Sequence, residues 1–358
     1  MRTAIIYGGR SGEHDVSCVS AANVLREIDR ERFTPVPIGI DRDGSWFLQD
    51  MPSESDLEAN ILHVEPNSSR RIAFQPGTGF TLQGENLGID VVFPVLHGTF
   101  GEDGTVQGLM DLLDIPYVGS GVRGSSISMD KVISKQLWEH HRLPVVPYIT
   151  LHAHMYEQDK QEFLYRIESE LGIPVFIKPA RGGSSVGVYK AHTSAELHDC
   201  IVKAFQYDTK LIIEKSVTAV EVECSVLGNS APHIFPPASI RSTHEYYDYE
   251  AKYQDPDGAH FNIPADIPED IRDSLMQLAA RAFSAVDARG LARIDFFYDE
   301  DSGSLYLNEI NTMPGFTSIS LFPRMCEDGG LPYKQLITGL VDLAIQEHAL
   351  RASLRYQR

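Results

Sequence analysis

The sequence predicts a protein of the α/β and α+β class, with a parallel sheet in its first third and two α+β lobes after it. Three observations support this class. In the first third, short apolar runs alternate with helical patterns, as in parallel sheets with crossover helices. In the middle third, two strand-like runs flank a loop rich in glycine and serine. The last third is rich in strands and carries two of them around an acidic turn, "DEDSG".

The first third begins with the run "TAIIYGG", whose glycines end a buried strand. Its expected elements are strands at 3–9, 33–41 and 90–98 and helices at 15–28 and 103–114. Together they predict a Rossmann-like domain over residues 1–122. The stretch 45–86 carries no motif, and its structure is left open.

The middle third is expected to form a small lobe over residues 123–217. Thr193 and Glu196 have the spacing of a capping box at the start of its later helix. The expected elements are helices at 129–141 and 193–205 and strands at 173–179, 186–191 and 210–217.

The last third is expected to form a second lobe over residues 218–358. An amphipathic helix at its end is expected to cover a sheet. The expected elements are strands at 219–228 and 232–240, helices at 268–288 and 333–350, and a hairpin at 291–315.

Composition limits the function classes. The net charge of -19 argues against a broad surface for nucleic acid or anionic membrane. No apolar run reaches the roughly 18 residues that a membrane span needs. The four scattered cysteines, without a C-x-x-C pair, indicate reduced thiols in a cytoplasmic protein.

The loop in "KPARGGSSVGVYK", residues 178–190, has the residue types of a phosphate site but no common fingerprint. Gly182 and Gly187 have Walker A spacing, yet Val188 follows them where that motif requires lysine. The N-terminal glycines also resemble a dinucleotide fingerprint, but Tyr7 stands in place of its first glycine. NAD is therefore a weak hypothesis.

The hairpin carries the most specific chemical signal. Residues two apart on a strand share a face, so Glu309 and Asn311 project together and Asp295 can face them. These oxygens suit Mg²⁺, whereas a solvated acidic face is the alternative. The apolar neighbours favour the metal, because unpaired burial of acids is costly. Arg293 is either a carboxylate clamp or a structural salt bridge.

Other candidates are individually weaker. Lys131 and Lys178 are each either solvated or point charges for a nucleotide tail, and the nearby loop favours the second reading. Glu13 follows a strand and can hold a substrate ammonium, although the same turn can simply cap a helix. His97 ends another strand and is either a ligand contact or a buried structural histidine. The tyrosine-rich stretch 244–253 is a lid candidate or an ordinary surface loop.

Over essentially its whole length the chain resembles the D-alanine–D-alanine ligase family of ATP-grasp enzymes. The resemblance implies an ATP-grasp architecture in which the two lobes sandwich ATP. The motifs occur in the family's order: "GGRSGEHDVS", "VLHGTFGEDGTVQG", "YVGSG", "SMDK", "IKPARGGSSVG", "IEK", "YDYEAKY", "ARIDFF" and "NEINTMPGFTSIS".

The resemblance also implies the site residues. The ATP phosphates would contact Lys131, Lys178, Lys252 and the loop 182–186 with Ser185, and adenine and ribose would contact Glu214, Lys215, Val217 and Glu221. Two Mg²⁺ (or Mn²⁺) ions would bind Asp295, Glu309 and Asn311. The first D-alanine would bind Glu13, and the second would bind Arg293, Ser320 and Leu321 in the turn 315–321, with His97 nearby.

The implied reaction makes D-alanyl-D-alanine for peptidoglycan precursors through an acyl phosphate. Arg293 and the Gly315 amide would stabilise the tetrahedral oxyanion. A hydrogen-bonded bridge of Glu13, Ser184 and Tyr253 would tie loop, lid and first domain together. Tyr253 favours D-alanine as acceptor, because lactate-forming relatives usually lack it.

The resemblance leaves alternatives and a partner expectation. Ligation of D-serine or D-lactate, or another ATP-grasp carboxylate–amine ligation, is the main alternative. A nucleotide-binding regulatory module is disfavoured, because it has no need of both metal ligands and an oxyanion group. Relatives are commonly dimers, so we expect a homodimer.

Overall fold

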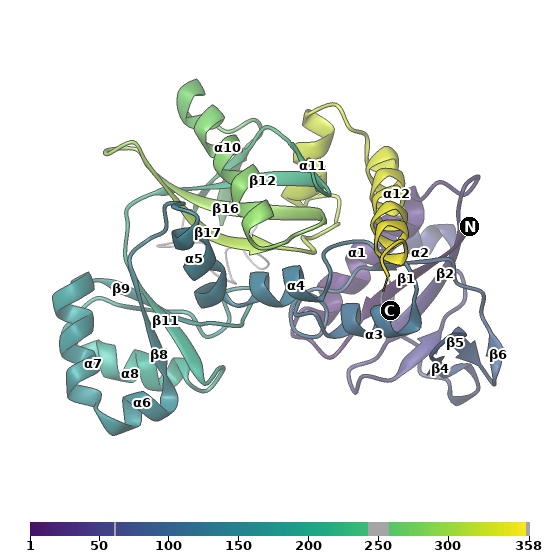
Figure 1. Ribbon diagram of the computed structural model, residues 1–358, viewed down its shortest axis with the longest axis horizontal. Helices are drawn as coiled ribbons and strands as arrows, with labels where there is room; N and C mark the ends of the chain where they lie inside the picture. The colour runs from purple at the N-terminus through teal and green to yellow at the C-terminus, as the bar shows by residue number, and fades with distance from the viewer. Residues whose placement is uncertain (61, 243–257, 356–358) are drawn as a thin grey trace.

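The computed structural model describes residues 1–60, 62–242 and 258–355 (Figure 1). The strands in these ranges form four sheets. The first has the order β3-β2-β1-β7, in which β1 (Arg2–Gly8) pairs in parallel with β2 (Thr34–Ile40) and β7 (Val91–Pro94). An antiparallel edge strand, β3 (Trp46–Leu48), completes it. The predicted parallel sheet is confirmed.

Helices cover both faces of this sheet because successive side chains of the buried strands point to opposite sides. Ile5 and Phe93 pack in one core cluster with α1 (His14–Glu27), whereas Ile6 and Val92 pack in another with α3 (Thr105–Leu113). The central strands are therefore buried on both faces, as their unbroken apolar runs predict.

Residues 45–86, for which the sequence predicted no structure, add a small antiparallel sheet beside the first one. Phe74 and Phe80 lie edge-on to Trp46, which joins the two sheets. Its elements are α2 (Glu54–Glu58), a short 3₁₀ turn η1 (Ser68–Arg70), β4 (Ile72–Gln75), β5 (Gly79–Leu82) and β6 (Glu85–Asn86).

The middle of the chain forms a four-stranded antiparallel sheet in the order β10-β9-β11-β8, at the lower left of Figure 1. The predicted capping box is wrong: Thr193 is the N-cap of α8, but Glu196 Oε2 accepts from the His192 amide instead. The elements are α4 (Val122–Met129), α5 (Lys131–His140), β8 (Tyr148–His152), α6 (Ala153–Gln158), α7 (Lys160–Arg166), η2 (Ile167–Leu171), β9 (Val175–Pro179), β10 (Tyr189–Ala191), α8 (Ser194–Ala204) and β11 (Lys210–Lys215).

The last third forms an antiparallel sheet in the order β15-β14-β12-β16-β17, with β13 beside β12. The predicted hairpin is confirmed as β16 (Gly290–Asp299) and β17 (Ser304–Asn311) around the acidic turn. The other elements are β12 (Val220–Gly228), β13 (His233–Ile234), β14 (Ala238–Ser242), β15 (Ala259–Asn262), α10 (Glu269–Ala285), α11 (Leu321–Asp328) and α12 (Tyr333–Ala352).

The C-terminal helix α12 packs against the N-terminal part of the chain. It lies beside α1 and β1 in Figure 1. Leu336, Ile337 and Leu340 share a core cluster with Ile5 and Val24 of the first sheet and its helix. The predicted domain boundaries, after residues 122 and 217, stay predictions. No helix in the described ranges is both long enough and apolar enough to cross a bilayer.

Candidate active site

A cleft of about 510 Å³ lies between the central sheet and the last sheet, a size typical of small-molecule sites. Residues far apart in the sequence meet on its walls. The sequence-predicted residues that line it are Lys131, Lys178, Ser184, Ser185, Glu214, Lys215, Val217, Glu221, Arg293, Asp295 and Glu309.

The glycine- and serine-rich loop joins the antiparallel strands β9 and β10, as the sequence predicts. Ser184 and Ser185 have φ values of 51° and 58°, the left-handed region that non-glycine residues rarely adopt. Gly187 follows at φ 76°, where a Cβ would come within 2.6 Å of the Tyr207 ring. Such strained loop geometry is common where a backbone must approach a ligand.

The loop reaches the first third of the chain through Ser184, whose hydroxyl donates to Glu13 Oε1 at 2.5 Å. Glu13 lies just before α1, and its amide donates to Ser11 Oγ at 3.0 Å. A Cβ at Gly98 would lie 2.3 Å from Glu13 Oε2, so only glycine at this position leaves room for the Glu13 carboxylate. Two members of the predicted bridge thus meet, whereas its third member, the lid stretch 244–253 and Lys252 lie outside the described residues.

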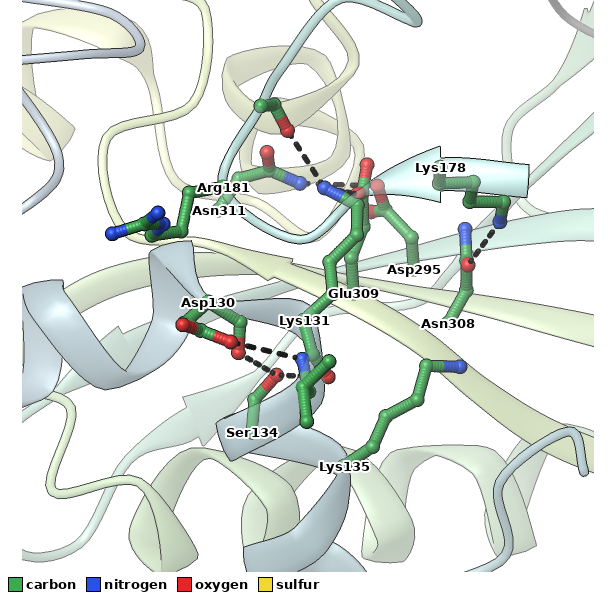
Figure 2. Close-up of polar contacts among 12 residues, drawn as sticks. Asp130, Lys131, Ser134, Lys135, Lys178, Arg181, Asp295, Asn308, Glu309 and Asn311 are labelled. Carbon is green, nitrogen blue, oxygen red and sulfur yellow. Dashed lines mark hydrogen bonds and ion pairs between the residues drawn. The ribbon is translucent and has the colours of Figure 1, made fainter. Parts of the chain in front are cut away.

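The hairpin brings the predicted metal ligands together. Asp295 lies opposite Glu309 in the strand pair, and Arg293 lies opposite Asn311. The register then shifts so that Phe296 faces Leu307, which leaves Asn308 as an extra residue in a β-bulge. Figure 2 shows the side chains of Asp295, Glu309 and Asn311 converging at this end of the hairpin.

Basic groups already contact these acids. Arg293 donates from Nε to Asp295 Oδ1 at 2.8 Å and from Nη2 to Oδ2 at 2.6 Å, and it lies 3.0 Å from Glu223 Oε2. Burial alone would lower the pKa of Arg293, but Asp295 and Glu223 together hold it well above its usual value. Asn311 Nδ2 donates to Asp295 Oδ2 at 3.1 Å.

Lys131 and Lys178 approach the site from different elements (Figure 2). Lys131 is the first residue of α5, where Asp130 caps the helix by accepting from two amides. Its ammonium lies 2.9 Å from Glu309 Oε2 and donates to Gly182 O at 2.7 Å. In this way it connects the loop to the hairpin.

Lys178 is the last residue but one of β9, and its ammonium lies 2.6 Å from Glu214 Oε2 on the adjacent strand β11. The opposite oxygen of Glu214 lies 2.6 Å from Lys135 Nζ. Burial would raise the pKa of Glu214, but the two lysines lower it to about 2. The carboxylate is therefore ionised inside the protein.

The rest of the cleft suits a flat ring and its sugar. Lys215, Val217 and Glu221 line it where β11 passes into β12. The apolar side chains of Phe176 and Phe297 line it as well. This mixture of apolar surface, main-chain edges and a carboxylate is what a nucleoside requires.

The remaining predicted residues gather around the loop after β17. His97 is buried, with Nδ1 2.9 Å from Met313 O and Nε2 3.0 Å from Ser20 Oγ. Burial lowers the pKa of His97, which favours the neutral ring. Ser320 Oγ accepts from the Thr317 amide at 3.1 Å, and Leu321 begins α11. A Cβ at Gly315 would lie 2.7 Å from Ser320 Oγ.

Sequence reasoning missed Lys135 and Glu102. Lys135 stands four residues after Lys131, hence on the same helix face, and that spacing was the available signal. Glu102 accepts from the amides of Gly98 and Met313, each at 2.9 Å. Burial and then the charge of Glu13 raise the pKa of Glu102 to about 8. No sequence pattern pointed to Glu102.

The hairpin fits a divalent cation by its chemistry. Two carboxylates and an amide provide a hard oxygen set, and cationic groups already lie against both acids. Among the described residues no three His, Cys, Asp or Glu side chains form a metal cluster. A magnesium ion here would therefore depend on water and phosphate oxygens for its other ligands.

Comparisons with known proteins point to one family over nearly the whole chain. The family model described as D-ala D-ala ligase N-terminus matches residues 2–120, and that described as D-ala D-ala ligase C-terminus matches residues 137–342. The D-alanine–D-alanine ligase of Treponema denticola is 44% identical over 354 residues, covering 96% of each chain.

Two solved structures are similar as well. The D-alanine-D-alanine ligase from Coxiella burnetii has a TM-score of 0.84 at 32% identity, over 98% of this chain and 97% of that one. The VanG D-Ala:D-Ser ligase from Enterococcus faecalis has a TM-score of 0.85 at 33% identity, over 96% of this chain and 99% of that one.

Proposed function

Because this chain belongs to the D-alanine–D-alanine ligase family, we propose that its cleft binds ATP and two D-alanine molecules and joins the amino acids. The chain is a ligase, and the family's reaction is the ATP-dependent synthesis of D-alanyl-D-alanine for peptidoglycan. One observation supports this assignment to the cleft most directly. Asp295 faces Glu309 on one wall while Lys131 and Lys178 approach from two other elements.

We propose that the nucleotide base packs against Phe176 and Phe297, which line the cleft, and that its ribose lies toward Glu221. Its phosphates extend toward Lys131 and Lys178, whose present partners are Glu309 and Glu214. The lysines then act as point charges on the phosphates, while the loop amides close over them.

The first D-alanine binds with its ammonium at Glu13, which the Ser184 hydroxyl orients. Its carboxylate attacks the γ-phosphorus of ATP, giving ADP and an acyl phosphate. Catalysis of this step is mostly positioning and charge neutralisation, which the lysines and loop amides supply. Bound Mg²⁺ at Asp295, Glu309 and Asn311 would neutralise phosphate charge.

The second D-alanine binds with its carboxylate near Arg293, Ser320 and Leu321. Its amine, after losing a proton, attacks the acyl carbon. Arg293 and the Gly315 amide stabilise the oxyanion that forms, and phosphate then leaves. Asp295 and Glu223 both contact the guanidinium, so Arg293 is already oriented before substrate arrives.

D-serine is a second candidate acceptor, supported by the likeness to the D-Ala:D-Ser ligase. A homodimer stays a prediction, to be checked by light scattering on the purified chain.

The experiment that tests the function is phosphate release from ATP and Mg²⁺ with single amino acids. We expect D-alanine alone to support release and to yield D-alanyl-D-alanine, and L-alanine to support none. No release with D-alanine would exclude the proposed function. Faster release when D-serine or D-lactate is added to D-alanine would change only the acceptor assignment.

A further inference from the structure

The main chain of Met313 is held at both its N–H and its carbonyl oxygen by residues from the first third of the chain. Its N–H donates to Glu102 Oε1 at 2.9 Å, and its carbonyl oxygen lies 2.9 Å from His97 Nδ1. The second oxygen of Glu102 accepts from the Gly98 amide at 2.9 Å. One carboxylate therefore fastens the loop after β7 to the loop after β17.

The same segment is fastened again three residues later. The Phe316 amide donates to Ser20 Oγ at 3.2 Å, and Ser20 Oγ lies 3.0 Å from His97 Nε2. A neutral His97 protonated at Nδ1 satisfies all these contacts, because it donates to Met313 O and accepts from the Ser20 hydroxyl. Hydrogen bonds to the first third of the chain thus hold both ends of the segment 313–316 in place.

Gly315 lies between these two attachments. Pro314 has no N–H, and the amides of Met313 and Phe316 are taken by Glu102 and Ser20. In the part of the chain that the structure describes, the Gly315 N–H has no hydrogen-bond acceptor. It is also the one residue from 312 to 316 that is not buried.

From this geometry we infer that Glu102 is a positioning residue, which together with Ser20 holds the Gly315 amide in place for the developing oxyanion. The inference depends on the role proposed above for that amide. A donor stabilises an oxyanion only where it is already aimed, and a misplacement of about 1 Å can cost roughly 100-fold in rate.

Both oxygens of Glu102 accept amide protons, which the ionised carboxylate does best. Because the pKa of Glu102 is raised to about 8, the variants are compared above that pH, where the carboxylate is ionised. Glutamine has the same shape but replaces one oxygen with an NH₂ group, which would face an amide N–H. Glu102→Gln should therefore release one of the two loops without opening a cavity. Asp103→Asn is the matched control: Asp103 also accepts from two amides, those of Phe100 and Thr105, but it does not contact Met313.

The test compares dipeptide formed with phosphate released in the presence of ATP, Mg²⁺ and D-alanine. If the Gly315 amide is misplaced, amine attack slows while acyl phosphate still forms, and water converts that intermediate to D-alanine and phosphate. We expect Glu102→Gln to lower kcat for dipeptide roughly 10- to 100-fold, with phosphate release lowered less and the KM for ATP unchanged. Ser20→Ala, at the other end, should show the same loss of coupling.

Equal falls in dipeptide and phosphate would overturn the inference, and so would an equal loss of coupling in Asp103→Asn. A thermal melt of each variant separates these outcomes from misfolding, and Ser20→Ala provides a second test if Glu102→Gln does not fold. Failure of the proposed function would be seen separately, as wild-type enzyme that makes no dipeptide.

Discussion

Lys135 and Glu214 form an ion pair inside the protein, with 2.6 Å between Nζ and Oε1 and side chains that are 0% and 3% exposed. The second oxygen of Glu214 binds Lys178, which faces the cleft. If nucleotide phosphates draw Lys178 toward themselves, Lys135 remains as the counter-ion of the buried carboxylate.

Lys135→Met should therefore destabilise the protein strongly. Removing one partner of a buried ion pair typically costs about 3–5 kcal/mol when the other charge is left without compensation. Because Lys178 still pairs with Glu214 after the substitution, we expect a loss near the lower end of that range. The free energy of unfolding in urea at neutral pH measures this loss. The exposed Lys203→Met serves as control and should change little. An unfolding free energy for Lys135→Met equal to that of the control would contradict the expectation.

Acid should weaken the protein through Glu214. Its pKa falls from the ordinary 4.5 to about 2 in the folded state, so the unfolded chain binds the proton more readily. Glu214 thus contributes stability that is complete above pH 4.5 and is lost as the pH falls toward 2. Glu214→Gln should flatten the pH dependence of the unfolding free energy in that window. The exposed Glu58→Gln should keep the wild-type slope, and equal slopes for all three proteins would refute the assignment.

Asp295→Asn should lower activity by about 100-fold or more and raise the Mg²⁺ concentration needed, because a charged ligand is lost and Arg293 loses its two-point partner. Phosphate release measured across a Mg²⁺ titration, with EDTA-treated enzyme as the starting point, gives both quantities. Asp301→Asn, in the exposed turn of the same hairpin, should titrate as wild type. The metal assignment fails if the Mg²⁺ midpoint of Asp295→Asn does not move.

Ser184→Ala should lower kcat about 10-fold and raise the KM for D-alanine, because the hydrogen bond to a charged Glu13 is worth roughly 1.5–3 kcal/mol. Steady-state kinetics with ATP held saturating provides the measurement. Ser230→Ala, exposed in the loop between β12 and β13, is the control. Wild-type kinetics in Ser184→Ala would mean that the contact with Glu13 is structural only.

The residues that could be predicted from sequence are those governed by local periodicity. Strand alternation placed Glu309 and Asn311 on one face, and the acidic turn placed Asp295 opposite them. The bulge at Asn308 could not be predicted, because one extra residue in a ladder depends on how both strands pack. The capping box failed for a local reason, since the amide of His192 competes for Glu196.

The roles of residues whose partners are far away along the chain could not be predicted, for a different reason. Glu102 and Met313 are 211 positions apart, and Glu102 binds a main-chain amide, which has no sequence signature. Lys135 looked like any helical lysine because its burial depends on β11 packing against α5. The roles of the other site residues came from resemblance to a family, and their arrangement around one cleft needed the structure.

The packing of α12 against the first sheet has a consequence for synthesis on the ribosome. Ile5 and Val24 are made early, yet Leu336, Ile337 and Leu340 complete the same core only near the end of translation. Domains usually fold in order as they emerge from the ribosome. The first sheet, however, keeps apolar surface uncovered until α12 has been synthesised. The nascent chain is therefore a natural client for chaperones, and a ribosome that stalls before α12 would release an aggregation-prone product.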